Sequence, residues 1–291
     1  MHINNKPKVS VGMPVYNGAK YIREALDSLL SQTYADFELI ISDNASTDGT
    51  QQICEEYACK DSRIRYVRQL NNLGALNNFQ FVLNEAVGEY FMWAAADDIW
   101  SFNWIESLLQ LSSKNKNIFG FGQVLVIDEN SILRYHVANN RVFNFSGNKF
   151  FRRMKYYFEP EFLGKANVIY GLFRVEDIKK ILLIDYEFDY NINYDLLQFC
   201  EIKCNSEATI YKRIHDDNEE NVDGINEKFN RNTFAKIVTN IFLMPMKEIN
   251  MYLVGYIRHS NYLESIFLSL LYPLKVILVY YNLIKIKLTR Y

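Results

Sequence analysis

Short apolar runs alternate with amphipathic segments along the first 128 residues of the chain. The runs are bounded by turn-forming residues and predict strands at 8–16, 37–43, 64–69, 89–95 and 118–128. The segments between them repeat apolar residues at helical spacing; in the first, Ile22, Leu26 and Leu29 share one face. This alternation predicts an α/β fold with a Rossmann-like, mostly parallel central sheet and helices on both of its faces.

Polar residues follow several of these strands at the point where each strand ends. Tyr16-Asn17, Asp43-Asn44 and Asp97-Asp98 come directly after the first, second and fourth predicted strands. Ligands of parallel α/β sheets bind outside the carboxyl ends of the strands. We therefore expect these three pairs to meet at one edge of the sheet and to form a ligand site.

The second half of the chain has a less regular pattern. Residues 183–202 predict an acidic loop that enters a helix, and residues 207–224 predict a strand that runs into a charged loop. Beyond residue 226 the pattern is helical. The expected division is 1–225 for the main domain, with halves at 1–128 and 129–225, and 226–291 for a C-terminal helical extension.

Composition and charge exclude some classes of partner. A net charge of −2 and a hydrophobic share of 49% are typical of a globular protein, and they give no basic surface for nucleic acid. The N-terminal residues MHINNKPKVS contain no apolar core of a secretory signal. We therefore expect a cytoplasmic location.

Asp97 and Asp98 end an apolar strand in the stretch MWAAADDIW (92–100). Carboxylates bind Mg²⁺ or Mn²⁺, and one or two suffice when the phosphates of a substrate supply further ligands. The alternative is a solvated turn in which Asp98 or Ser101 caps the next helix. Asp43 also has two interpretations, as an acceptor for the N–H of a base or as part of the turn-rich stretch DNASTDG.

Two segments together resemble glycosyltransferase family 2, whose members have a GT-A type fold. They are VSVGMPVYNGAKYIREALDSLLSQTYADFELIISDNASTDGT (9–50) and NNLGALNNFQFVLNEAVGEYFMWAAADDIW (71–100). The resemblance rests on the motifs P-x-Y-N, D-x-x-S-x-D-G-T and N-x-G and on a strand that ends in DD, in this order. It extends over about residues 8–215.

The resemblance implies an enzyme that transfers a sugar from a nucleotide-sugar donor, most commonly a UDP-sugar, to an acceptor hydroxyl with inversion at the anomeric carbon. It places Pro14 and Tyr16 in the nucleotide pocket and Asp43 at the base. The residues expected to bind the nucleotide sugar are Pro14, Tyr16, Asn17, Asp43, Asn71, Gly74, Asn78, Ala96, Asp97, Gly171 and Arg213. Arg213 would help to neutralise the leaving diphosphate.

The resemblance also implies a divalent cation, Mn²⁺ or Mg²⁺, with Asp97, Asp98 and His215 as its candidate ligands. Asp97 corresponds to the last acid of the D-x-D motif of the family. Ala95 stands where the first acid of that motif is expected.

The resemblance also implies a catalytic base, an acid at the mouth of a helix in the later part of the domain. Asp195, in INYDLLQFC, matches best, and Tyr194 stands in the place of the Glu that often precedes the base. Asp189 and Asp185 are the alternatives. Asp195 could also be a first-turn acid that complements the helix dipole.

The C-terminal stretch 262–291 is strongly apolar and ends in basic residues. Pro273, Lys275 and Asn282 interrupt it. We expect a peripheral amphipathic helix on the cytoplasmic face of a membrane, which would suit a lipid-linked saccharide acceptor in cell-surface polysaccharide synthesis. The alternatives are a helix packed on the main domain or on a second copy in a homodimer, and a true membrane span.

Two other functions are compatible with parts of this pattern. A nucleotidyltransferase acting on sugar phosphates would have a similar order of elements, but it would need a glycine-rich basic loop where this chain has MPVYNGAKYI. A catalytically inactive relative that binds sugar nucleotides would explain Ala95 and the partial motif at Tyr194 and Asp195.

Overall fold

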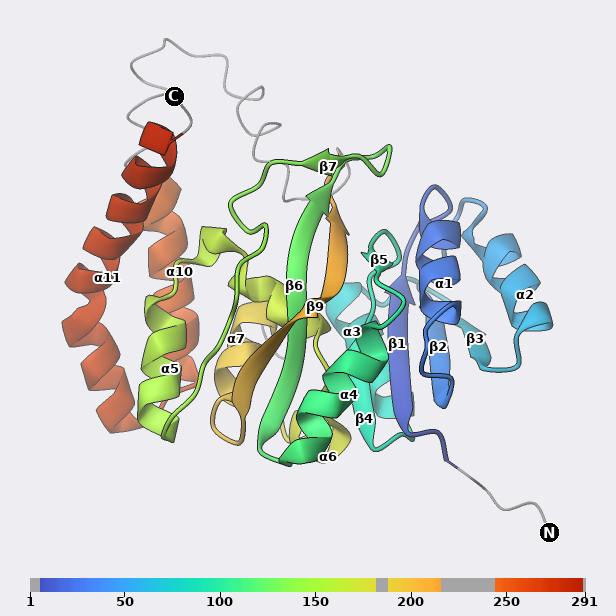
Figure 1. Ribbon diagram of the computed structural model, residues 1–291, viewed down its shortest axis with the longest axis horizontal. Coiled ribbons are helices and arrows are strands. Elements are labelled where there is room, and N and C mark those ends of the chain that lie inside the picture. The colour runs from blue at the N-terminus through green and yellow to red at the C-terminus, as the bar shows by residue number, and fades with distance from the viewer. Residues whose placement is uncertain (1–5, 182–187, 216–243, 290–291) are drawn as a thin grey trace.

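The computed structural model describes residues 6–181, 188–215 and 244–289 (Figure 1). Its first sheet has the strand order β3-β2-β1-β4-β8. The strands are β1 (Val9–Val15), β2 (Phe37–Asp43), β3 (Ile64–Arg68), β4 (Tyr90–Trp93) and β8 (Phe173–Arg174). β1 to β4 are parallel and β8 is antiparallel to β4. The prediction of a mostly parallel sheet is confirmed.

A second sheet has the order β5-β9-β6-β7. Its strands are β5 (Ile99–Trp100), β6 (Ile118–Ile127), β7 (Leu133–Arg134) and β9 (Glu201–Arg213). The predicted strand at 118–128 lies in this second sheet as β6, because β8 already pairs with the free side of β4. β6 pairs instead in parallel with β9, from a distant part of the chain.

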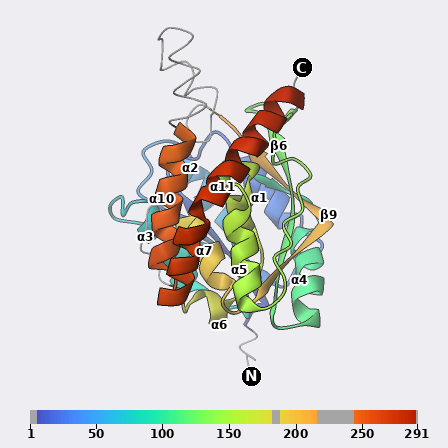
Figure 2. The ribbon, with the colours of Figure 1, turned by 90° about the vertical axis from the view of Figure 1, so that its left-hand side faces the viewer.

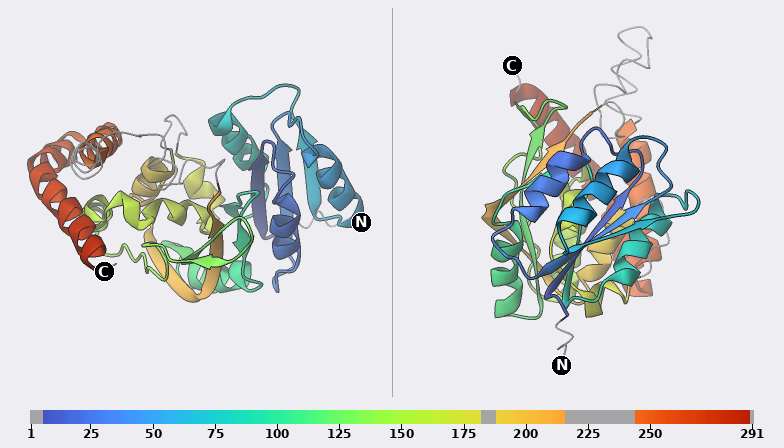
Figure 3. Two further views of the ribbon diagram at one scale, coloured as in Figure 1. Left: turned by 90° about the horizontal axis from the view of Figure 1, so that it is seen from above. Right: turned by 90° about the vertical axis from the view of Figure 1, so that its right-hand side faces the viewer.

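Helices cover both faces of the first sheet, as the alternation predicts. They are α1 (Ile22–Leu30), α2 (Thr50–Lys60) and α3 (Ala75–Glu85). α4 (Trp104–Lys114) packs on β6 and β9 of the second sheet. α1 buries Ile22, Leu26 and Leu29 completely, so its predicted apolar face is its packing face. α1 and α3 lie on opposite sides of the sheet, as Figure 3 shows.

The later part of the main domain contains short helices that precede β9 in the chain. These are α5 (Lys149–Phe158), η1 (Glu161–Leu163), η2 (Lys165–Tyr170), α6 (Val175–Ile178) and α7 (Phe188–Leu196). One hydrophobic core runs through both sheets and these helices. In it, the Trp93 ring packs edge-on against Phe91 and Phe173, and Trp104 packs edge-on against Phe121.

The C-terminal helices α10 (Met244–Arg258) and α11 (Tyr262–Thr289) form a hairpin at the end of the molecule farthest from α2 (Figures 1 and 2). Tyr256 and Leu268 of this hairpin are fully buried, and Lys275 is buried beside Glu161 of η1. The C-terminal segment is therefore packed on the main domain. The expected domain boundary at residue 225 lies outside the described residues.

Candidate functional site

The register of the first sheet brings the predicted polar ends together. Val15 lies opposite Asp43 across the β1–β2 pair, and Gly12 lies opposite Trp93 across the β1–β4 pair. The chain therefore leaves β1, β2 and β4 at one edge. Ala96 lies beside the turn after β1, because a Cβ added at Gly18 would be 3.6 Å from the Ala96 Cβ.

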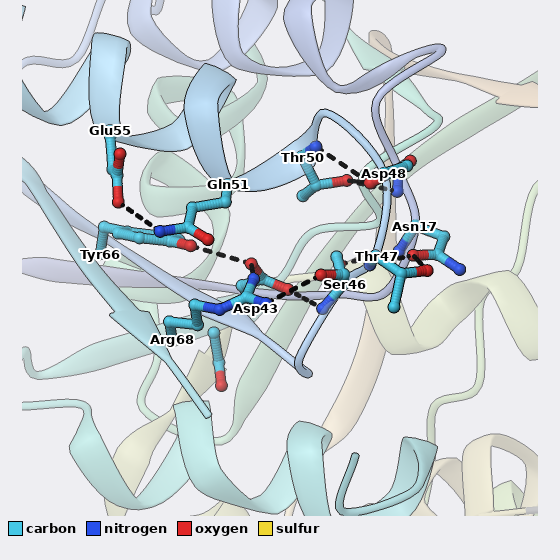
Figure 4. Close-up of polar contacts among 12 residues, drawn as sticks. Asn17, Asp43, Ser46, Thr47, Asp48, Thr50, Gln51, Glu55, Tyr66 and Arg68 are labelled. Carbon is cyan, nitrogen blue, oxygen red and sulfur yellow. Dashed lines mark hydrogen bonds and ion pairs between the residues drawn. The ribbon is translucent and has the colours of Figure 1, made fainter. Parts of the chain in front are cut away.

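The stretch DNASTDGT forms a hydrogen-bonded turn that joins the ends of β1 and β2 (Figure 4). The Asn17 side-chain oxygen accepts from the Thr47 N–H at 2.8 Å, and the Ser46 hydroxyl accepts from the Asn17 N–H at 2.9 Å. Asn17 and Ala45 have φ angles of 52° and 61°, in the left-handed region that non-glycine residues rarely adopt. Asn17 therefore shapes this edge of the site from within the turn.

Asp43 is completely buried at the centre of this arrangement. One carboxylate oxygen accepts from the Ser46 N–H, and the other accepts from the Tyr66 hydroxyl and from Arg68, each at 2.8 Å. Burial and the contact with Asp43 raise the pKa of Tyr66. The sequence analysis missed Tyr66 and Arg68, although pairing of β2 with β3 places Arg68 directly opposite Asp43.

A cavity of about 200 Å³ opens between β1, the end of β2 and the start of α3. It is lined by Pro14, Val15, Tyr16, Asn44, Asn72, Ala75, Asn78 and Phe79. Pro14, Tyr16 and Asn78 are expected site residues and Asn44 belongs to one of the expected polar strand ends, whereas Asn72 and Phe79 were not foreseen. Tyr16 is 51% exposed, so its ring is available to a ligand at the mouth of the cavity.

In the turn before α3, it is Asn72 and not the expected Asn71 that lines the cavity. Asn71 is exposed and does not line the cavity. The Asn72 side-chain oxygen accepts from the Gly74 N–H at 2.8 Å and from the Asn44 amide at 2.9 Å. Asn72 is also the asparagine of the N-x-G motif, which was the signal that could have identified it. Gly74 has φ of 80°, which a β-carbon would disfavour.

Asn78 is buried and exchanges two hydrogen bonds with Ser42 of β2. It therefore fixes α3 against the sheet while it lines the cavity. Gly171 lies at a close approach to the second sheet, since an added Cβ would be 2.3 Å from the Phe119 ring and 2.5 Å from the Gly120 carbonyl oxygen. Packing against β6 explains this glycine.

Asp97 and His215 meet at the end of β4. The Asp97 carboxylate is 3.0 Å from the His215 Nε2, and the Lys212 ammonium lies nearby. Burial opposes ionisation of Asp97, but the hydrogen bond with His215 and the charge of Lys212 outweigh it and lower the pKa of Asp97. Lys212 was not foreseen, although it stands three residues before His215 and one before Arg213.

Asp98 and Arg213 hold this turn together from inside the protein. The buried Asp98 carboxylate accepts from the Arg213 N–H at 2.9 Å, and the Arg213 Nε donates to the Asp97 carbonyl at 2.8 Å. The guanidinium also contacts Glu24 and Ser131 and has 0% exposure. Arg213 therefore positions Asp97 and does not face the solvent side of the site.

The expected cation ligands are only partly brought together. In the part of the chain that the structure describes, no three His, Cys, Asp or Glu side chains lie close enough to hold an ion. Asp97 and His215 do lie together, and a carboxylate with an imidazole is a donor set that suits Mn²⁺, provided that substrate phosphates fill the other positions. The chain thus fits a cation that is bound jointly with a diphosphate.

Asp195 is not at the mouth of a helix, so the expectation of its position is wrong. It lies in the last turn of α7, and Asp189 lies in the first turn. The Asp195 carboxylate is 2.5 Å from the His259 Nδ1 and 3.8 Å from the Arg153 guanidinium. The sequence analysis gave His259 no role, and Asp185 lies outside the described residues.

The fold is that of the GT-A glycosyltransferases. Residues 1–349 of TarS from S. aureus, solved in complex with UDP, superpose with a TM-score of 0.60 at 18% identity over 94% of this chain and 89% of that fragment. GalNAc-T7, solved with UDP, GalNAc and Mn²⁺, gives a TM-score of 0.55 at 12% identity over 73% of this chain and 45% of that protein.

The particular family follows from the sequence match. Residues 10–172 match the family described as Glycosyl transferase family 2, and the chain belongs to that family. A glycosyltransferase of Rickettsia typhi is 31% identical over 72% of this chain and 65% of its own length. The E. coli UDP-Glc:alpha-D-GlcNAc-diphosphoundecaprenol beta-1,3-glucosyltransferase WfgD is 34% identical over 46% and 52%, respectively. The chain spans 20% to 65% of the length of the curated relatives that it matches first.

Proposed function

We propose that the protein transfers a sugar from a UDP-sugar to an acceptor hydroxyl and inverts the anomeric centre. The main support is that the cavity beside Tyr16, the buried Asp43 and the Asp97–His215 pair all lie at the edge of the first sheet where β1, β2 and β4 end. TarS has been solved in complex with UDP-GlcNAc, and the name of WfgD gives UDP-Glc, which supports a UDP-sugar as the donor. The name of WfgD also supports a lipid-linked saccharide acceptor and a place in cell-surface polysaccharide synthesis.

The residues divide the work by position. The cavity holds the base and ribose, with Tyr16 against the base. Asp43 is fully buried and does not line the cavity, so its role is to hold the neighbouring turn through Ser46, Tyr66 and Arg68. Asp97, His215 and Lys212 face the diphosphate, and Mn²⁺ or Mg²⁺ bound there would stabilise the charge of the leaving nucleoside diphosphate. Positioning of the acceptor against the donor supplies much of the rate.

We propose Asp189 as the general base, with Asp195 as the second candidate. Asp189 is half-buried in the first turn of α7, whereas Asp195 has 9% exposure and is held by His259. A base must reach the acceptor hydroxyl, and a carboxylate as buried as that of Asp195, in the last turn of the helix, is poorly placed for this. Asp189→Asn should therefore stop transfer and leave UDP affinity unchanged, while Asp195→Asn should retain turnover. The reverse result would return the role to Asp195.

The function is tested by incubating the protein with a panel of sugar nucleotides and Mn²⁺ and measuring the released product. A glycosyltransferase releases the free nucleoside diphosphate. A nucleotidyltransferase would exchange pyrophosphate, and an inactive relative would bind donors, raise its melting temperature and release nothing. Either of these two results would overturn the proposal.

We also propose that α11 contacts the cytoplasmic face of a membrane. Tyr262–Ile286 is long and apolar enough to cross a bilayer, and 22% of its most apolar window is buried. A span would carry Glu264 and Lys275 away from Arg153 and Glu161, their buried partners in the main domain. An outward apolar stripe includes Leu263, Ile266, Leu270, Leu274, Ile277, Tyr281 and Ile284. Peripheral contact through this stripe keeps both ion pairs.

A further inference from the structure

A cavity of about 540 Å³ lies between α5 and α11, on the side of the molecule that Figure 2 presents. Its apolar lining consists of Phe145, Phe151, Met154, Phe158, Pro160, Leu163 and Leu278. The volume falls within the range of about 300–1,000 Å³ that is typical of sites for small ligands. The proposed glycosyl transfer uses none of these residues.

Charged side chains stand around this apolar cavity. Arg141 pairs with Glu159 at 2.7 Å, and the Lys155 ammonium donates to the Ser146 carbonyl, a neutral acceptor, at 3.4 Å. Arg141, Lys155 and Glu159 all line the cavity, so its charged residues carry one net positive charge. An apolar interior with cations at its border is complementary to a hydrocarbon chain that bears a phosphate.

The cavity is continuous with the outward stripe of α11. Leu278 lines the cavity and is one helical turn from Leu274 and Tyr281, which are 53% and 61% exposed. On the other helix, Phe151 lines the cavity and is 59% exposed. A lipid in a membrane beneath α11 would therefore meet the opening of the cavity directly.

We propose that this cavity binds one chain of an anionic membrane phospholipid, with the phosphate against Arg141 and Lys155. The inference rests on the proposed membrane contact of α11. A second copy of the chain is the alternative occupant. Its own α11 stripe would cover α11 with apolar side chains, but it would bring no anion to Arg141 and Lys155. A phospholipid satisfies the apolar lining and the charge together.

The test is native mass spectrometry of the full chain with phosphatidylglycerol, phosphatidylcholine or a polyprenyl phosphate in separate samples. Wild type should retain phosphatidylglycerol about tenfold better than phosphatidylcholine, as expected of a charge-assisted contact. Lys155→Glu should remove this preference, and Met154→Trp should reduce retention of both lipids by filling the cavity. Lys149→Glu is the matched control, because Lys149 is exposed on the same helix and does not line the cavity.

Three results of the mass spectrometry would overturn the inference. These are equal retention of the two phospholipids, an equal effect of Lys149→Glu and Lys155→Glu, and preferential retention of the polyprenyl phosphate, which would make the cavity an acceptor site. The inference would also be overturned if the wild-type protein were a dimer and Leu274→Ser made it monomeric, because the outward face of α11 would then be a dimer interface. Release of UDP from donor, measured on the same samples, reports the proposed transferase function separately. Vesicle flotation of Leu270→Ser/Leu274→Ser reports the membrane contact separately from the cavity.

Discussion

At the residue scale, neighbouring acids in this protein differ in what they contact. Asp97 and Asp98 are adjacent, yet the Asp97 side chain is 27% exposed and faces His215, whereas the Asp98 side chain is fully buried against β9. Asp43 is buried as well and is held by two side chains from β3. Exposure therefore separates the carboxylate that can meet a ligand from those that shape the site.

Asp97→Asn tests this division. Loss of the charge should weaken Mn²⁺-dependent binding of UDP by about 10- to 150-fold, which corresponds to the 1.5–3 kcal/mol typical of a charged contact. Titration calorimetry with UDP, with and without EDTA, measures it. Asp98→Asn is the control. It should lower the melting temperature but leave the Mn²⁺-supported affinity for UDP close to that of wild type. An Asp97→Asn variant that keeps wild-type sensitivity to EDTA would refute the role of Asp97.

At the element scale, the hairpin of α10 and α11 is held to the main domain by buried charges. Glu161 of η1 contacts Lys165 at 2.9 Å, Lys275 of α11, and the Tyr256 hydroxyl of α10 at 3.2 Å. Burial lowers the pKa of Lys165 to about 7, although the negative charge of Glu161 acts to raise it. One carboxylate thus compensates two buried lysines, which makes it hard to remove.

Glu161→Gln should lower the free energy of unfolding by about 3–5 kcal/mol, because it leaves two buried lysines without an anion. Urea denaturation followed by circular dichroism measures the change. The matched control is Glu159→Gln, which breaks the half-exposed pair with Arg141 and should cost less than about 1 kcal/mol. Equal losses in the two variants would show that the buried cluster does not hold the hairpin.

The same carboxylate predicts a pH dependence. Burial opposes ionisation of Glu161, but the charges of Lys165 and Lys275 outweigh it and lower the pKa of Glu161 below 4.5. Its stabilising contribution is therefore complete above pH 4.5 and is lost as the pH falls through the folded-state pKa. The stability difference between wild type and Glu161→Gln should narrow as the pH falls below 4.5, where Glu161 becomes protonated in the folded wild type. A difference that keeps growing below this pH would contradict the assignment.

At the scale of the whole molecule, the C-terminal hairpin is a structural part of the protein as well as the candidate membrane contact. Arg153 of α5 is 1% exposed, pairs with Glu264, and donates to the His259 carbonyl at 2.6 Å. His259 in turn contacts Asp195 of α7. The hairpin therefore contacts the helix that carries the candidate base.

A chain that ends at residue 243 should unfold more easily than the full chain. Loss of Tyr256 and Leu268 from the core should remove at least about 3 kcal/mol, or about 6–12 °C in melting temperature. Differential scanning fluorimetry of both chains measures the shift. The full-length variant Leu270→Ser/Leu274→Ser is the control, because both residues are exposed and should change stability by less than about 1 kcal/mol. An unchanged melting temperature after truncation would make the hairpin a separable tail.

Local pattern was sufficient for the elements of the first half of the chain. The strands around Val11, Ile40 and Phe91 are buried on both faces, and continuous apolar runs identify such strands without tertiary information. The order of strands and helices then restricts the topology to a mostly parallel sheet. For the same reason the polar residues after β1, β2 and β4 could be assigned to one edge, because parallel strands end on the same side.

The amino-acid sequence alone thus determined the family, the parallel sheet and the edge of that sheet at which the candidate site lies. All three follow from local periodicity and from motifs that are contiguous in sequence. Tertiary structure decided the partners of side chains that are far apart in sequence. It placed Tyr66 and Arg68 on Asp43, turned Arg213 inward, paired β6 with β9, and gave the apparent interruption Lys275 a buried counter-ion. Burial and long-range charge pairing depend on how distant segments pack, and no local pattern contains that information.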